Sequence, residues 1–90
     1  MLIGVPREIK NHEYRVGLTP ASVRELARRG HRAIVQRDAG AAIGLANEAY
    51  RAVGAEVVDT ADEVFARAEL IVKVKEPQPQ ECLMLREGQL

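Results

Sequence analysis

Cysteine, tryptophan and long apolar runs are scarce in this sequence. Its 90 residues include one cysteine, Cys82, no tryptophan and only 3% aromatic residues, so any core must be aliphatic. A single cysteine excludes an internal disulfide framework and a multi-cysteine metal cluster, and we interpret Cys82 as a reduced thiol of no special role. No stretch approaches the roughly 20 apolar residues of a membrane-spanning helix. The short apolar start lacks the basic region of a signal peptide, so we expect a cytoplasmic protein that does not bind membranes.

No charge of either sign predominates. Thirteen Lys and Arg residues balance thirteen Asp and Glu residues, which gives a formal net charge of zero. A nucleic-acid binder normally carries a basic excess or a basic stripe, so we expect no nucleic-acid partner. The hydrophobic fraction of 47% and the charged fraction of 29% are typical of an ordinary globular chain. The length is sufficient for one small domain of modest stability.

Motifs for cofactor, metal and nucleophile chemistry are also missing. Neither G-x-G-x-x-G nor a P-loop occurs, and the glycine-containing stretch 40–44 is interpreted as a tight connection. His12 and His31 are not spaced as metal ligands, and we interpret them as a solvated loop residue and a capping or surface residue. Cys82 has no base nearby in the sequence. We therefore expect no catalytic, cofactor-binding or metal-binding residue from these patterns.

Short apolar segments alternate with amphipathic segments along the chain. The pattern predicts one helix that begins after Thr19, a second that Asn47 caps, and a third that begins after Thr60. A further short helix is predicted within 78–85. Predicted strands cover residues 2–5, 33–35, 55–58 and 70–74. These strands are too apolar for one face to be wet. The alternation therefore predicts an α/β fold, a parallel β-sheet with helices on both faces of the flavodoxin-like or Rossmann-like type.

Charged side chains follow two of the predicted strands at the edge where ligands bind in such sheets. Arg15 lies in the loop after the first strand, where a neighbouring acid such as Glu8 or Glu13 could hold its planar fork toward a substrate carboxylate. A solvated loop with surface ion pairs is the alternative interpretation.

Two lysines mark the fourth predicted strand. Lys73 and Lys75 are two positions apart, so on a strand they would share one face. Lys75 is nearer the strand end and is the candidate for the ligand crevice, although a frayed strand end in water is the alternative. Lys73 is expected to pair with an acid on a covering helix. Together, Arg15 and Lys75 predict a positive pocket for a small anion such as a keto acid or an amino acid.

The last residues, 86–90, look like a turn that leads into further structure. No fifth strand follows the fourth predicted strand. We expect that the chain is truncated, and that the isolated chain is marginally folded or self-associating because one sheet edge is unprotected.

Two motifs near the ends of the chain closely resemble the amino-terminal part of alanine dehydrogenases. Shorter segments fit the same family in order and spacing: Asp38-Ala39-Gly40, Gly54-Ala55-Glu56 and Leu85-Arg86-Glu87-Gly88. The two motifs themselves are Ile3-Gly4-Val5-Pro6-Arg7-Glu8-Ile9-Lys10-Asn11, followed by Arg15-Val16 and Leu18-Thr19-Pro20, and Ile71-Val72-Lys73-Val74-Lys75-Glu76-Pro77.

This resemblance implies a specific reaction. Alanine dehydrogenases convert L-alanine, NAD and water to pyruvate, ammonia and NADH. By resemblance, Arg15 and Lys75 bind the carboxylate and the carbonyl group of pyruvate or L-alanine, and residues 1–90 form the amino-terminal substrate domain. The NAD-binding domain and the family's catalytic histidine and aspartate lie downstream, so the chain is expected to be inactive alone. The full-length family members are homo-oligomers, namely hexamers.

Other interpretations remain beside this one. The alpha subunit of nicotinamide nucleotide transhydrogenase has a similar amino-terminal domain, but Lys75 before Glu76-Pro77 looks like the dehydrogenases. A saccharopine-dehydrogenase-like origin fits less well. The other alternative, from a different class, is a non-catalytic binding or assembly module.

Overall fold

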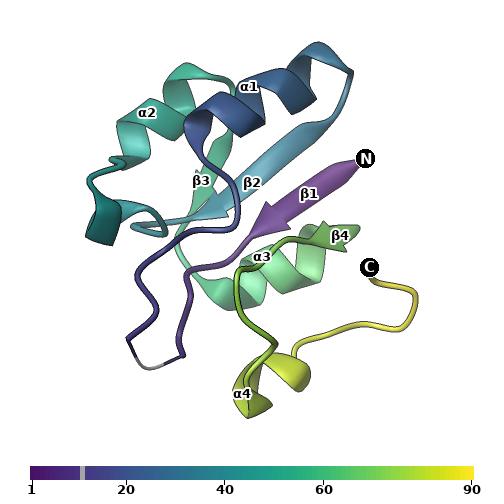
Figure 1. Ribbon diagram of the computed structural model, residues 1–90. Helices are drawn as coiled ribbons and strands as arrows, with labels where there is room; N and C mark the ends of the chain where they lie inside the picture. The colour runs from purple at the N-terminus through teal and green to yellow at the C-terminus, as the bar shows by residue number, and fades with distance from the viewer. Residues whose placement is uncertain (11) are drawn as a thin grey trace.

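A four-stranded parallel sheet with helices on both faces organises the chain (Figure 1). The computed structural model describes residues 1–10 and 12–90, so Asn11 of the first family motif lies outside the described residues. The sheet has the strand order β3-β2-β1-β4. The predicted α/β class is therefore confirmed. The elements are β1 (Leu2–Val5), α1 (Pro20–Arg28), β2 (Arg32–Gln36), the 3-10 helix η1 (Ala41–Ile43), α2 (Asn47–Ala52), β3 (Glu56–Val58), α3 (Ala61–Arg67), β4 (Leu70–Ile71) and α4 (Pro79–Cys82).

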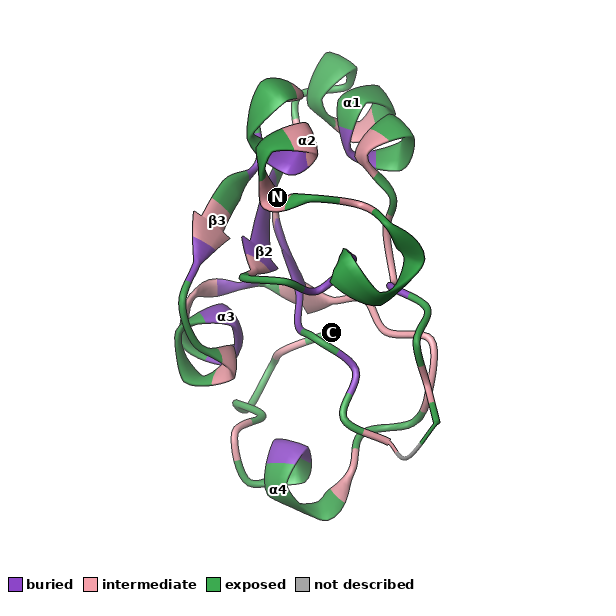
Figure 2. Cartoon of the chain, turned by 90° about the vertical axis from the view of Figure 1, so that its left-hand side faces the viewer, coloured by how far each residue is buried: buried purple, intermediate pink, exposed green. Residues whose placement is uncertain are grey.

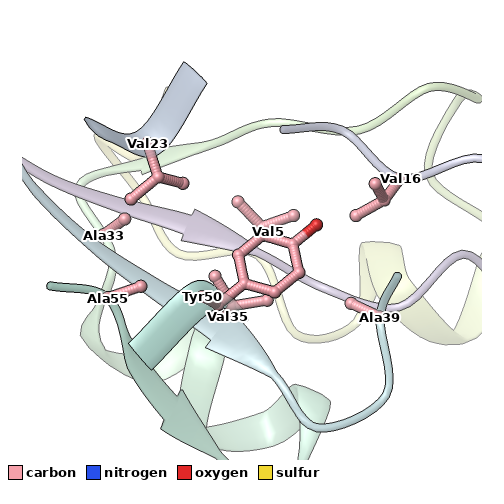
Figure 3. Close-up of a cluster of buried hydrophobic side chains, with 8 residues drawn as sticks. All are labelled: Val5, Val16, Val23, Ala33, Val35, Ala39, Tyr50 and Ala55. Atoms are coloured by element: carbon pink, nitrogen blue, oxygen red, sulfur yellow. The ribbon is translucent and has the colours of Figure 1, made fainter. Parts of the chain in front are cut away.

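The main core lies between the sheet and the helices α1 and α2 (Figure 3). Its members are small aliphatic residues around one aromatic ring, that of Tyr50, which is 1% exposed. The Tyr50 hydroxyl donates a hydrogen bond of 2.7 Å to the Leu18 carbonyl oxygen, which satisfies the polar end of this buried side chain. Leu18 belongs to the segment that leads from the Arg15 loop into α1, so this bond ties that segment to the core.

Helix α3 covers the opposite face of the sheet. Its fully buried residues Val64 and Phe65 face the sheet, where α3 contacts β1 and β2. Gly4 of β1 permits this close packing, because a Cβ there would lie 2.6 Å from the Cβ of Ala68 and 2.8 Å from a methyl carbon of Val64. Buried residues in Figure 2 accordingly lie mainly along the strands and the inward sides of the helices.

Two of the three predicted helix starts are confirmed. Thr19 accepts a hydrogen bond from the Ser22 amide, and Thr60 accepts one from the Glu63 amide, as N-caps do. The prediction that Asn47 is a cap is wrong, since the cap position is Ala46.

Asn47 instead stabilises the turn after β2. Its side chain accepts a hydrogen bond from the Asp38 amide (2.8 Å) and donates one to the Asp38 carboxylate (3.1 Å). Asp38 has a φ of +63°, a left-handed conformation in which a side-chain partner offsets the backbone cost. The turn at Asp38 therefore competes with the helix start for the same amide side chain.

Strand β4 is shorter than predicted. It ends at Ile71 instead of Val74, and the Val72 amide makes one further bond to the Gly4 carbonyl oxygen at 2.9 Å. Beyond it, the amides of Val74 and Lys75 donate to the Glu8 carboxylate and not to a neighbouring strand. The prediction that Lys73 and Lys75 share one face of a strand is therefore wrong, because a buried carboxylate turns the backbone away from the sheet.

The carboxy-terminal residues return to the sheet. Arg86 and Gln89 donate side-chain hydrogen bonds to the carbonyl oxygens of Phe65 and Ala68 at the end of α3. Leu90 then lies beside β4, since its amide donates to the Glu69 carbonyl (3.0 Å). The short helix expected within 78–85 is present as α4. Among the described residues, no helix is long and apolar enough to cross a membrane.

Candidate functional site

Arg15 and Lys75 line one cavity of about 390 Å³. It lies where the chain leaves β1 and β4, two parallel strands that are neighbours in the sheet. The other lining residues all come from the loop after β1: Lys10, His12, Glu13 and Tyr14. The tertiary structure therefore brings together the two residues that strand-end reasoning selected separately.

Glu13 holds the guanidinium of Arg15 through two parallel bonds. Arg15 donates from Nε to Oε2 (3.0 Å) and from Nη2 to Oε1 (2.9 Å), and its backbone amide donates to Oε2 as well. The hydrogen bonds from Arg15 lower the pKa of Glu13 to about 2, and the same contact raises the pKa of Arg15. The sequence offered Glu8 and Glu13 as partners for Arg15. Glu13 is the partner in the structure, and Glu8 pairs with Lys73 instead.

Part of the Arg15 guanidinium remains available for a ligand. Its side chain is 64% exposed, whereas that of Glu13 is only 5% exposed. A guanidinium has five N–H donors in a fixed fork, and the bonds to Glu13 engage its Nε and Nη2 side. The end of the fork formed by Nη1 and Nη2 has the geometry that binds a carboxylate through two bonds. Glu13 thus orients Arg15 without using all of its donors.

The Lys75 ammonium forms no salt bridge with any carboxylate in the described ranges 1–10 and 12–90. Its sequence neighbour Glu76 is engaged by Lys10, whose hydrogen bond lowers the pKa of Glu76. The cavity lining carries the cationic side chains of Lys10, Arg15 and Lys75 and the carboxylate of Glu13. Since Glu76 compensates Lys10 and Glu13 compensates Arg15, the excess positive charge among the described residues of the site is that of Lys75. Such a site attracts a small anion.

A glycine lets the two site segments approach each other closely. A Cβ at Gly17 would lie 2.5 Å from the carbonyl oxygen and 2.9 Å from the carbonyl carbon of Val72. Gly17 follows Arg15 by two positions, and Val72 precedes Lys75 by three. The separation of the two candidate residues therefore depends on a backbone contact that only glycine permits.

A buried charged cluster lies beside the cavity and consists of Glu8, Lys73 and Glu81. The Lys73 ammonium is 3.0 Å from Glu8 Oε1 and 2.9 Å from Glu81 Oε2, and all three side chains are at most 6% exposed. Lys73 was expected to pair with an acid on a covering helix; it pairs with Glu81 of the short helix α4, which does not cover a face of the sheet (Figure 1), and with Glu8 of the loop after β1. Sequence reasoning missed the part played by Glu8, although a buried lysine needs a nearby carboxylate.

The remaining residues singled out in the sequence have modest environments. His12 is exposed with a φ of +62°, and its Nδ1 is 3.3 Å from the Tyr14 hydroxyl, at the rim of the same cavity. Cys82 is exposed, and the His31 ring is 3.4 Å from the amino terminus. Within the part of the chain that the structure describes, no group of three or more His, Cys, Asp or Glu residues could hold a metal ion.

Known proteins are similar to this chain in sequence and in fold. The family model described as "Alanine dehydrogenase/PNT, N-terminal domain" matches residues 4–90. An alanine dehydrogenase from Mycolicibacterium smegmatis is 53% identical over 89 residues, which cover 99% of this chain and 24% of that protein. The NAD(P) transhydrogenase subunit alpha from Cereibacter sphaeroides is 43% identical over 89 residues, which cover 99% of this chain and 17% of that protein.

A solved structure of an L-alanine dehydrogenase has the same fold. Its TM-score is 0.92 at 48% identity, and the match covers 96% of this chain and 24% of that chain. The chain thus spans about a quarter of the length of the alanine dehydrogenases that it matches. Because the family model covers nearly all of the chain and the fold agrees, the chain belongs to the family of alanine dehydrogenase and PNT N-terminal domains.

Proposed function

We propose that residues 1–90 are the amino-terminal, substrate-binding domain of an NAD-dependent L-alanine dehydrogenase and are inactive alone. The observation that carries this proposal is the shared cavity of Arg15 and Lys75, in a chain that is about half identical to alanine dehydrogenases. The substrates proposed are L-alanine and pyruvate.

The two cations suit different parts of pyruvate. Arg15, oriented by Glu13, binds the carboxylate through the open end of its guanidinium. Lys75 donates to the keto oxygen and stabilises the negative charge that develops there when ammonia attacks the carbonyl carbon. Binding the carboxylate and the keto oxygen at the same time fixes the orientation of pyruvate, which has no other polar groups.

NAD does not fit the residues of this chain. The turn after β1 contains Pro6, Arg7 and Glu8 where a pyrophosphate-binding turn needs glycines. We therefore propose that NAD, which accepts the hydride when bound, is held by a part of the enzyme that this chain does not cover. A homo-oligomer, a hexamer when full length, is proposed from the family resemblance alone, and a cytoplasmic location is proposed from the sequence.

A chimera tests the proposal directly. Residues 1–90 replace the matching segment of the M. smegmatis alanine dehydrogenase, and NADH formation from L-alanine and NADH consumption with pyruvate and ammonia are measured. We expect an active chimera. Arg15→Ala should lower kcat/KM for pyruvate roughly 10- to 100-fold, the effect of losing a hydrogen bond to a charged group. Lys75→Ala should lower kcat by about 100- to 1,000-fold, as the loss of an oxyanion donor does.

The controls separate these effects from folding and from the alternative family member. Arg24→Ala changes an exposed arginine of α1 away from the cavity and should leave both rates within about twofold, as surface substitutions usually do. Turnover that survives both Arg15→Ala and Lys75→Ala would refute the assignment of these residues. A parallel chimera with the C. sphaeroides transhydrogenase subunit alpha tests the alternative that the chain comes from a transhydrogenase. If this second chimera is active and the dehydrogenase chimera is not, the dehydrogenase proposal is contradicted.

A further inference from the structure

The carboxylate of Glu8 joins the two segments that form the candidate site. Glu8 lies in the loop after β1, which also carries Arg15, and its side chain is only 2% exposed. It accepts three hydrogen bonds from the segment after β4: one from the Lys73 ammonium (3.0 Å), one from the Val74 amide (2.9 Å) and one from the Lys75 amide (3.3 Å). Glu8 therefore contacts the backbone of Lys75 directly.

These bonds hold the backbone at Val74 and Lys75. The segment beyond Val72 has left the sheet, so no strand ladder sets the position of the backbone at Val74 and Lys75. Glu8 supplies the acceptors that the ladder would otherwise supply. The close approach of Gly17 to Val72 and the exposed ion pair of Lys10 with Glu76 also connect the same two segments. Of these contacts, those of Glu8 are buried and reach the backbone of Lys75 itself.

We propose that Glu8 is a positioning residue that acts through Lys75 and places its ammonium opposite Arg15 for a small keto acid. This inference rests on the proposed function. The Glu8 carboxylate is turned toward Lys73 and the backbone. It is absent from the lining of the 390 Å³ cavity that Arg15 and Lys75 share, although Glu8 lines a neighbouring cavity of about 260 Å³, so we assign it a positioning role and not substrate binding.

A simpler role for Glu8 would be to neutralise Lys73. Glu81 also contacts the Lys73 ammonium, at 2.9 Å, but its other oxygen accepts from the Gln78 amide within α4 and not from Lys75. Glu81→Gln therefore disturbs the charge pairing of Lys73 without removing an acceptor from the Lys75 backbone. It is the matched control for Glu8→Gln.

A double-mutant cycle between Glu8 and Lys75 distinguishes positioning from a purely structural role. The cycle is made in the chimera, with kcat/KM for pyruvate as the readout. Glu8→Gln should lower kcat/KM between about 10- and 100-fold when Lys75 is present, because a misplacement of the order of 1 Å can cost about 100-fold. With Lys75→Ala, the same substitution should change kcat/KM by less than about twofold. Glu81→Gln should give the same fold-change in both backgrounds.

Equal losses from Glu8→Gln in both backgrounds would overturn the inference. If Lys75→Ala alone has no effect, the proposed function fails instead, so the two failures are distinguishable. The same four variants are also compared by their dissociation constants for pyruvate, measured by calorimetry with NADH and without ammonia. Binding remains measurable in this way when turnover is very slow.

Glu8→Asp is the second variant should Glu8→Gln not fold. It keeps the charge that faces Lys73 but withdraws the oxygens by one methylene from the amides of Val74 and Lys75. We expect it to show the same dependence on Lys75. Full activity of Glu8→Asp would show that only the charge matters, and it would overturn the positioning role.

Discussion

Replacing Lys73 with methionine would remove the ammonium that lies between two buried carboxylates. Glu8 and Glu81 lie 3.0 Å and 2.9 Å from that ammonium, with side chains 2% and 1% exposed. Methionine fills a similar volume, so the substitution mainly removes the charge. The two carboxylates would then face each other in a site that water hardly reaches.

The expected destabilisation is large for a chain of this length. Breaking a buried ion pair by removing one partner costs about 3–5 kcal/mol, because an uncompensated charge stays buried. A domain of 90 residues has a total stability of roughly 5–13 kcal/mol at the usual 0.05–0.15 kcal/mol per residue. Lys73→Met should therefore remove between a quarter and nearly all of the free energy of unfolding.

Urea unfolding followed by far-ultraviolet circular dichroism measures this loss. Lys10→Met is the matched control, because the Lys10–Glu76 pair is solvent-exposed, with side chains 41% and 64% exposed. An exposed pair contributes about 0–1 kcal/mol, so the control should cost no more than that. The reasoning is refuted if the two methionine variants destabilise the chain equally.

Three further predictions concern the site loop and the core. The carboxyl of Glu13 should titrate at about pH 2 by NMR; since Arg15 lowers this pKa below its ordinary value of 4.5, the pair stabilises the fold above pH 4.5 and loses that contribution as the pH falls toward 2. Arg15→Ala should return the midpoint toward 4.5, and an ordinary midpoint in the unaltered chain would contradict the pairing. Tyr50→Phe should cost about 1–2 kcal/mol in urea unfolding, because it leaves the half-buried Leu18 carbonyl without its donor; an unchanged midpoint would count against this bond. Gly17→Ala should cost about 1–3 kcal/mol, since its methyl group meets a backbone carbonyl oxygen at 2.5 Å, and a thermal transition as high as that of the unaltered chain would show that the loop simply moves away.

The parts of the fold that depend on local signals were predictable. The α/β class followed from apolar segments that alternate with amphipathic ones. The N-cap Thr19 and the start of the third helix after Thr60 followed from residue type and position. The cap at Asn47 and the length of β4 were mispredicted, because in both places a partner distant in sequence takes the hydrogen bonds. The backbone amide of Asp38 donates to the side-chain oxygen of Asn47, and Glu8 accepts from the backbone amides that would extend β4.

Residue chemistry and strand-end reasoning alone determined that Arg15 and Lys75 were the candidates, since parallel strands end at one edge of a sheet whatever the loops do. Only the tertiary structure decided which acids hold them: Glu13 the guanidinium, and Glu8 the backbone of Lys75. The sequence of a loop has no periodicity that would predict which acid contacts which cation or backbone amide. Their conformation is set by buried charges that must find counter-charges and by one glycine that allows two backbones to touch.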